Sequence, residues 1–140
     1  MKYFFILLLS FFSFGAQAAD ETIEMLNKLD KEIMVFSKKI VRIDVGNKVF
    51  WKATDKGHNV EFIKSGVPEG VDKFKSKFNQ DVEYTFTIPG IYAYWCTPHK
   101  NMGMIGFVVV GNDKSNLENI KKIRFSARSK KIAPGLIESL

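Results

Sequence analysis

The sequence predicts a mainly β fold, an antiparallel β-sandwich followed by a helical C-terminal extension. Three patterns indicate it: short segments of alternating polar and apolar residues, turn residues at close intervals between them, and helical spacing concentrated after residue 115. Alternation places one face of a strand in a core and the other toward solvent. A succession of such strands is typical of two packed sheets. We expect the sandwich over about residues 22–111 and the helices over about residues 115–140.

Residues 1–18 are expected to be a cleaved signal peptide. Lys2 precedes an apolar run that ends at Phe14, and Ala16-Gln17-Ala18 has the small residues of a signal-peptidase site. The apolar run is shorter than the roughly 20 residues that a membrane-spanning helix needs. Residues 19–140 have a suitable length for a single domain. We therefore expect an exported, periplasmic protein with no membrane anchor.

The strand pattern is clearest in two segments, Val41–Val45 and Glu83–Ile88, where polar and apolar residues alternate strictly. Each segment is followed by a turn pair, Gly46-Asn47 or Pro89-Gly90. Aromatic and β-branched residues are denser in other segments, as expected where two sheets face one another. These segments are Lys48–Ala53, Ile91–Cys96 and Ile105–Val110.

Helical signals follow the last predicted strand. Ser115 and Glu118 fit a capping box, in which each side chain bonds a backbone N–H group at the start of a helix. A second helix is expected from about Ala127 to Leu140, although Pro134-Gly135 would interrupt or restart it. A short helical turn is also expected around Val71–Phe78. The apolar face of the first helix would comprise Leu117, Ile120 and either Ile123 or Phe125.

The charge pattern argues against nucleic acid as a partner. The formal net charge is +6, and removing Lys2 with the signal peptide leaves +5. The lysines are scattered among acidic residues, and the chain has no arginine-rich stretch or recognition helix. A weakly cationic face that docks an acidic protein partner fits this pattern better.

Cys96 is the only cysteine, although exported proteins normally pair their cysteines. Its thiol is either buried and inert or bound to something other than a second cysteine. The loop from Cys96 to Met104 also holds His99, so that a thiolate, an imidazole and a thioether lie between two predicted strands. His58, the only other histidine, can supply a second imidazole.

This donor set is the one expected of a blue-copper site. Two imidazoles and a thiolate form a trigonal plane in such sites, and a methionine sulfur binds weakly along the axis. A structural zinc site would instead prefer four strong ligands. We predict one copper ion, cycling between Cu(I) and Cu(II), bound by His58, Cys96, His99 and Met104. Met102 is the competing candidate for the axial position.

The sequence resembles the pseudoazurins, which are members of the cupredoxin family of type 1 blue-copper proteins. The resemblance covers essentially the whole of residues 19–140 and includes Thr54–Glu61, Phe74–Lys77 and the loop Cys96–Met104. Plastocyanin-like proteins share the ligand spacing but end at the sandwich, whereas pseudoazurins carry a helical extension. The resemblance implies a cupredoxin-type Greek-key sandwich and favours Met104 over Met102 as the axial ligand.

The resemblance also implies roles for residues around the ligands. Asn59 would brace the two ligand segments and donate a backbone hydrogen bond to the Cys96 sulfur, and Thr97 would lie in the same supporting layer. His99 would reach the surface inside an apolar docking patch. Lysines near that patch would steer an acidic partner. The docking residues would be Met34, Pro98, Met102, Lys56, Lys75, Lys77 and Lys100.

The sequence departs from the family pattern in three places, one of which is Pro134-Gly135 in the expected last helix. Trp95 stands where a lysine usually precedes the ligand cysteine, and it would either extend the docking surface or shield a strand edge. Lys100 and Asn101 replace a more usual aromatic residue and glycine, which places a charge beside the expected electron exit.

The function that follows from the resemblance is one-electron transport by a monomer. Its partners would be a respiratory-chain cytochrome as donor and an acidic-faced reductase, such as nitrite reductase, as acceptor. An enzyme is not expected, because both histidines are already ligands and Cys96 lacks the neighbouring histidine of multicopper oxidases. The alternative is a periplasmic copper carrier or chaperone that delivers the ion rather than its electrons.

Overall fold

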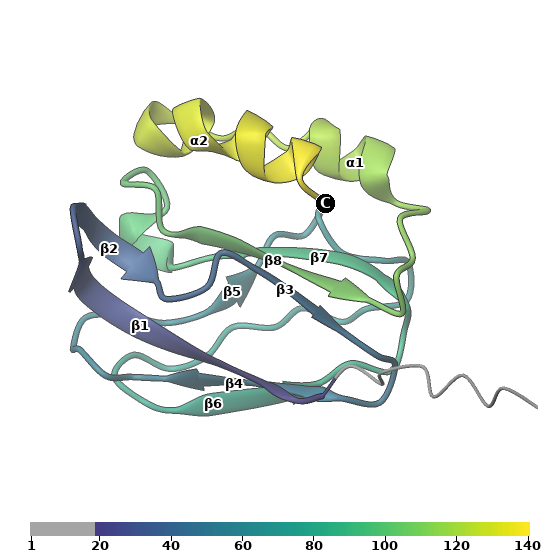
Figure 1. Ribbon diagram of the computed structural model, residues 1–140, viewed down its shortest axis with the longest axis horizontal. Coiled ribbons are helices and arrows are strands. Elements are labelled where there is room, and N and C mark those ends of the chain that lie inside the picture. Colours follow the sequence, from purple (N-terminus) through teal and green to yellow (C-terminus); the bar gives the residue numbers. More distant parts are fainter. Residues whose placement is uncertain (1–18) are drawn as a thin grey trace, which may run out of the picture.

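The structure is a computed structural model that describes residues 19–140. Two four-stranded sheets pack face to face, and two helices lie across the outer face of one of them (Figure 1). The expected signal peptide lies outside the described residues. Within residues 19–140, no helix is both long and apolar enough to span a membrane.

One sheet has the strand order β2-β1-β4-β6. β1 is antiparallel to β2 and parallel to β4, and β4 is antiparallel to β6. Burial alternates along β1 and β4, because Ile23, Met25, Val49 and Trp51 point into the core. The strand bounds are β1 (Glu21–Leu29), β2 (Glu32–Phe36), β4 (Lys48–Lys52) and β6 (Val82–Thr85).

The other sheet has the order β3-β8-β7-β5. β7 is antiparallel to β8 and β5, whereas β3 is parallel to β8. The predicted sandwich is confirmed. Its two parallel pairings could not be predicted from alternation, because side chains alternate with the same period in parallel and antiparallel strands. The strands are β3 (Ile40–Ile43), β5 (Glu61–Phe62), β7 (Gly90–Trp95) and β8 (Ile105–Val110).

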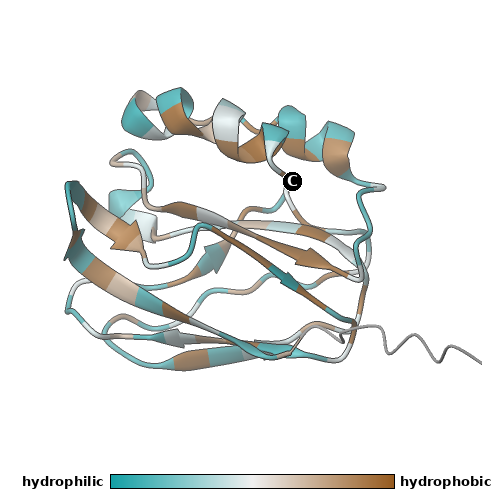
Figure 2. Cartoon of the chain, viewed as in Figure 1, coloured by the Kyte–Doolittle hydropathy of each residue, from teal (hydrophilic) through white to brown (hydrophobic). Residues whose placement is uncertain are grey.

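β7 and β8 are buried on both faces. All six residues of β8 are buried, since one face lies against the opposing sheet and the other lies beneath the helices. Figure 2 shows apolar residues along these strands and on the side of the helices that faces them. The central strands therefore hold the ends of their connecting loops in fixed positions, which matters for the loop between Cys96 and Met104.

Residues 71–77, between β5 and β6, contain no helical turn, so the expected helical turn at Val71–Phe78 is wrong. The Phe62 N–H donates to the Phe74 carbonyl at 2.9 Å, and Glu61 and Lys75 form a bridge. The free edge of β5 offers backbone partners to this segment, and these replace the bonds that a helical turn would make.

The first helix, α1 (Leu117–Lys121), begins without the predicted capping box. Asn116 precedes the helix, and its side-chain amide bonds the N–H and carbonyl groups of Ile91 at the start of β7, at 2.9 and 2.8 Å. The backbone N–H of Ser115 is bonded by Asp113 instead. The predicted apolar face is confirmed, because Ile120 is buried and the other residues pack against the same cluster: Leu117, Ile123 and Phe125.

The second helix, α2 (Ala127–Glu138), is continuous through Pro134. A proline inside a helix costs about 3 kcal/mol or more, because it removes one backbone hydrogen bond and crowds the preceding turn. Leu136 and Ile137 pack against the sheet and Ala133 is buried, whereas Pro134 and Gly135 lie on the exposed side. Packing of the apolar face thus holds the helix together across the break that the sequence suggested.

Candidate metal centre

Three predicted donor atoms converge at one end of the sandwich. His58, Cys96 and His99 each contribute one atom to a cluster in which all atoms lie within 4.8 Å of one another. The His58 and His99 Nδ1 atoms are 3.2 Å apart. The Cys96 Sγ atom lies 3.7 Å from His58 Nδ1 and 3.4 Å from His99 Nδ1. The two histidines come from segments 41 positions apart in the sequence.

This triangle has the dimensions of a metal site. A triangle with these three sides has a centre about 2 Å from each corner, which matches metal–nitrogen distances of about 2.0–2.1 Å and metal–sulfur distances of about 2.3 Å. Two imidazoles and one thiolate favour copper among the first-row metals. The three residues present therefore fit the ion without rearrangement of the chain.

His58 is held in one orientation by a residue of β1. Its Nε2–H group donates to the Asn27 side-chain oxygen at 2.9 Å, which leaves the Nδ1 lone pair directed at the other donors. Burial lowers the pKa of His58 and the charge of His99 lowers it further, against a smaller raising effect of Asp55. The ring is thus neutral at ordinary pH, as a ligand must be. Sequence reasoning did not single out Asn27.

Cys96 follows β7, and backbone hydrogen bonds close the loop that it opens. The Cys96 N–H donates to the Met104 carbonyl at 3.0 Å, and the His99 N–H donates to the Cys96 carbonyl at 3.1 Å. Burial raises the pKa of the Cys96 thiol, while the N–H groups of Asn59 and His99 oppose this rise. Metal binding must therefore displace a proton from this thiol.

The two candidate methionines occupy different environments. Met104 is fully buried and belongs to the same core cluster as Cys96, whereas Met102 is 36 % exposed. The Met104 thioether is therefore protected from solvent, and the backbone of Met104 is bonded to that of Cys96. An exposed thioether is available to a partner protein.

Asn59 joins the two segments that carry the donors. Its side-chain oxygen accepts the Thr97 N–H and its side-chain nitrogen donates to the Thr97 hydroxyl, both at 2.9 Å. Asn59 is fully buried, so these bonds are shielded from water. The neighbours of His58 and Cys96 are thereby fixed to each other.

Comparison with known proteins agrees with this geometry. Residues 23–111 match the copper binding proteins of the plastocyanin/azurin family. A pseudoazurin from Paracoccus pantotrophus is 43% identical over 113 residues, covering 81% of this chain and 78% of the relative. The chain belongs to the pseudoazurins. Copper is the cofactor of this family, whose members carry electrons rather than act as enzymes.

Solved structures give the same assignment. The pseudoazurin crystal structure from Methylobacterium extorquens AM1 superimposes with a TM-score of 0.82 at 36% identity, covering 86% of this chain and 98% of the other. Pseudoazurin from Hyphomicrobium denitrificans gives a TM-score of 0.82 at 36% identity, covering 87% and 98%. Because these matches include the C-terminal helices, they distinguish the pseudoazurin fold from a bare sandwich.

Glu61 is a supporting residue that sequence reasoning did not single out. Its carboxylate accepts hydrogen bonds from the Thr97 hydroxyl at 2.6 Å and from Trp95 Nε1 at 3.1 Å, and it lies 3.6 Å from Lys75 Nζ. Burial raises the pKa of Glu61, but these hydrogen bonds and the Lys75 charge together lower it. Glu61 is the first residue of β5 and follows Asn59 by two positions. This position is the one sequence signal that could have suggested its supporting role.

Ser129 of α2 is a second residue that the sequence did not reveal. It is fully buried, donates to the Lys100 carbonyl, and accepts the Gly103 N–H at 3.1 Å. The Arg128 N–H also donates to the Asn101 carbonyl at 3.0 Å. The first turn of α2 therefore holds the segment between His99 and Met104.

The predicted docking residues differ in exposure. Pro98, Met102 and the four lysines are exposed, whereas Met34 is half-buried with a left-handed φ of 49°. Lys100 Nζ lies 5.0 Å from the centre of the Trp95 ring. Trp95 is half-buried and packs toward the helices, so it covers the outer face of β7. The four lysines are Lys56, Lys75, Lys77 and Lys100.

Proposed function

We propose that this pseudoazurin is a periplasmic one-electron carrier whose copper ion is held by His58, Cys96, His99 and Met104. It would accept electrons from a respiratory-chain cytochrome and pass them to a reductase such as nitrite reductase. It would act as a monomer that meets each partner transiently. The family membership supports the carrier role, and the donor geometry supports the ligand set.

The observation that carries the proposal is the preformed triangle of donor atoms. Bound copper supplies the exchange of one electron between its cuprous and cupric states. The protein holds the donors in place through Asn27 on His58, through Asn59 on the two segments, and through the backbone bonds of the loop. Donors that are fixed by hydrogen bonds favour one geometry for both oxidation states, which keeps rearrangement small.

The unequal burial of the donors supports an exit for electrons at His99. His58, Cys96 and Met104 are fully buried, whereas the His99 side chain is partly exposed. Pro98 precedes His99 in the 3-10 turn Thr97–His99, and the Met102 N–H donates to the His99 carbonyl at 2.9 Å. A small apolar contact around this edge, which would include Met34, suits a partner that must leave quickly.

The test is copper loading of the purified protein and of the Cys96→Ala variant. The parent should become intensely blue or green with cupric ion and bleach reversibly with ascorbate, because the thiolate gives the intense absorption. The variant should lose this absorption. If it keeps both the absorption and electron transfer, the proposed ligand set is wrong.

The same preparation separates electron transfer from copper delivery. A carrier of copper should give a pale protein that loses its ion to a mild chelator. An electron carrier should retain the ion, and its reduced form should be reoxidised when a periplasmic copper or haem reductase is added.

A further inference from the structure

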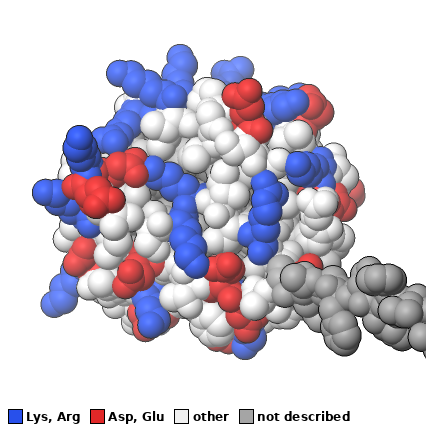
Figure 3. All heavy atoms as spheres, in the orientation of Figure 1, with Lys and Arg blue, Asp and Glu red and all other residues white. Residues whose placement is uncertain are grey.

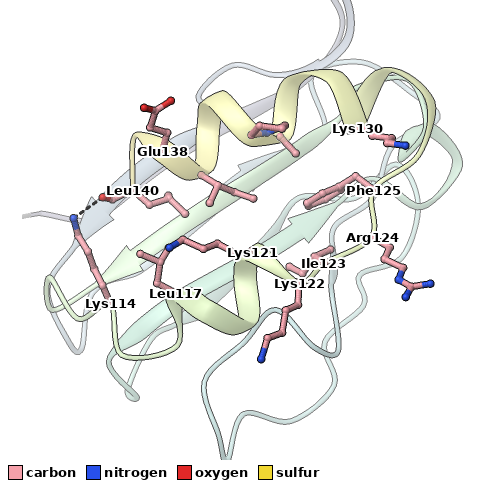
Figure 4. Close-up of a pocket in the computed structure, with 13 residues that line it drawn as sticks. Lys114, Leu117, Lys121, Lys122, Ile123, Arg124, Phe125, Lys130, Glu138 and Leu140 are labelled. Atoms are coloured by element: carbon pink, nitrogen blue, oxygen red, sulfur yellow. Dashed lines mark hydrogen bonds between the residues drawn. The ribbon is translucent and has the colours of Figure 1, made fainter.

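A groove between the two C-terminal helices lies outside everything that the copper site uses. It has a volume of about 960 Å³ and opens between α1, the segment 122–126 and α2 (Figure 4). None of the copper donors lines it. Its apolar walls are formed by Leu117, Ile123, Phe125, Ala133, Ile137 and Leu140.

The groove exists because α1 is too short to cover the apolar side of α2. With five residues, α1 buries Ile120 against the sheet but leaves Leu117 half-buried at its start. Phe125 and Ile137 are also half-buried, although they pack on the same cluster. Figure 4 shows Phe125 and Leu140 near opposite ends of the gap. The result is an apolar hollow of the size typical of small-molecule sites.

The rim of the groove is strongly cationic. Its acidic member, Glu138, points away from the gap (Figure 4). Figure 3 shows basic side chains gathered along the helical edge of the molecule. The cationic residues of the rim are Lys114, Lys121, Lys122, Arg124 and Lys130.

Some of these cationic side chains already have a partner within the protein, and others are free to bind a ligand. Lys121 pairs with Glu118 at 2.7 Å, and Lys114 donates to the Leu140 carbonyl. Among residues 19–140, neither Arg124 nor Lys130 forms an ion pair. Arg124 and Lys130 lie at the end of the gap where Phe125 is found, and neither is paired with a carboxylate of the described residues (Figure 4).

We propose that this groove binds a single-chain anionic amphiphile, a long-chain carboxylate of the fatty-acid type. The acyl chain would lie against Phe125, Ile137 and Leu117, which removes apolar surface from water on both sides. The carboxylate would meet Arg124, whose planar guanidinium can bind it through two parallel hydrogen bonds. Lys130 would add a second positive charge. An alcohol or ammonium of equal chain length lacks the charge that this rim selects.

The test measures binding of dodecanoate to the copper-loaded protein by titration calorimetry, below the concentration at which dodecanoate forms micelles. Saturable binding is expected for dodecanoate and binding at least tenfold weaker for dodecanol and for dodecyltrimethylammonium, because one charge-assisted hydrogen bond is worth about a factor of ten. Equal affinity for the three compounds would show that the rim charge selects nothing, and absence of binding would overturn the proposal outright.

Variants locate the site. Arg124→Glu changes an exposed side chain and should weaken dodecanoate binding about tenfold or more. Lys28→Glu is the matched control, since it makes the same charge change on β1 in the other sheet and should bind like the parent. Ile137→Trp, which fills the groove with an apolar side chain, should also reduce binding. Parental affinity in Arg124→Glu would contradict the proposal.

Two further outcomes would identify a different occupant. If dodecanoate fails to bind but an acidic amphipathic peptide does, the groove is a protein-docking surface. If vesicles of anionic phospholipid bind the protein equally in the parent and in Ile137→Trp, the basic rim acts as a membrane-contacting face. The visible spectrum of the copper-loaded protein reports on the metal centre independently, so failure here is distinct from failure of the proposed electron-carrier role.

Discussion

At the scale of single residues, the metal centre depends on side chains that never touch an ion. Asn27 selects which nitrogen of His58 is free, and Asn59 joins the backbones of the two donor segments. Asn27 forms a hydrogen bond to a ligand, and Asn59 forms hydrogen bonds to Thr97, the neighbour of a ligand. These bonds fix the orientation of the donor side chains.

Replacing Met104 and Met102 separately by glutamine tests which methionine is the axial ligand. Met104→Gln should change the visible spectrum and lower the reduction potential, because an amide oxygen stabilises cupric ion more than a thioether does. It should also destabilise the copper-free protein by about 1–3 kcal/mol, since a buried amide replaces an apolar side chain. Met102→Gln, on the surface, should leave the spectrum unchanged. The reverse pattern would assign the axial role to Met102.

The carboxylate of Glu61 should make stability depend on pH. Its pKa in the folded protein is lowered, so the contribution is present above the ordinary value of 4.5 and is lost as pH falls through the folded-state value. We expect Glu61→Gln to lower the free energy of unfolding by about 1–2 kcal/mol at pH 7, with a smaller difference from the parent in strong acid.

Urea titrations of the copper-free proteins at several pH values measure this difference. Glu83→Gln is the control, because that carboxylate pairs with Lys48 on the surface and should contribute less than about 1 kcal/mol. A difference for Glu61→Gln that is constant from neutral to strongly acidic pH would disprove the linkage.

At the scale of elements, the C-terminal extension does more than cover a sheet. The first turn of α2 binds the segment between His99 and Met104 through Ser129 and the Arg128 N–H. Gly103, at a φ of +99°, allows the chain to turn so that its N–H faces Ser129. These hydrogen bonds therefore hold the ligand loop in a fixed position against α2.

Ser129→Ala should weaken the attachment of the ligand loop to α2. The buried Gly103 N–H and the Lys100 carbonyl lose their partner, so the free energy of unfolding should fall by about 1–3 kcal/mol. In the copper-loaded protein the reduction potential should shift, because the loop that holds His99 and Met104 is released. Ser139→Ala removes an exposed hydroxyl that bonds Gly135 in the same helix and should change neither quantity. An unchanged potential in Ser129→Ala would mean that α2 stabilises the fold without positioning the loop.

At the scale of the whole molecule, positive charge surrounds two different features. The predicted docking lysines are all exposed, and a separate basic rim borders the groove between the helices. The net charge, +6 for the full sequence and +5 without residues 1–18, is spread over the surface and attracts acidic partners over distances of about a Debye length. Contact at the apolar edge of His99 would then decide how long a partner stays.

Electron transfer to an acidic partner should slow as salt is added. Stopped-flow rates should fall with rising ionic strength, because salt screens the attraction that accelerates encounter. Lys77→Gln and Lys100→Gln should each reduce the rate at low salt and flatten its salt dependence. Lys48→Gln, at the start of β4 and paired with Glu83, removes the same charge and should have less effect. Rates that are independent of salt would contradict electrostatic steering.

The sequence by itself determined the sandwich, the apolar face of α1 and a donor set suited to copper. These follow from side-chain periodicity and from the chemistry of Cys96, His99 and His58, which are local properties of the chain. The ligand set and the docking lysines stay predictions until the variants above are measured.

Only the tertiary structure decided which distant groups meet. The partners Asn27, Glu61 and Ser129, the parallel pairings and the use of Asn116 on β7 all depend on how separate segments lie beside one another. Pro134 shows the same limit, because packing held α2 continuous against its local preference. The physical reason is that composition and spacing specify which groups of a segment can be buried or can bind a partner. Which partner each group meets depends on the segments that the fold places beside it.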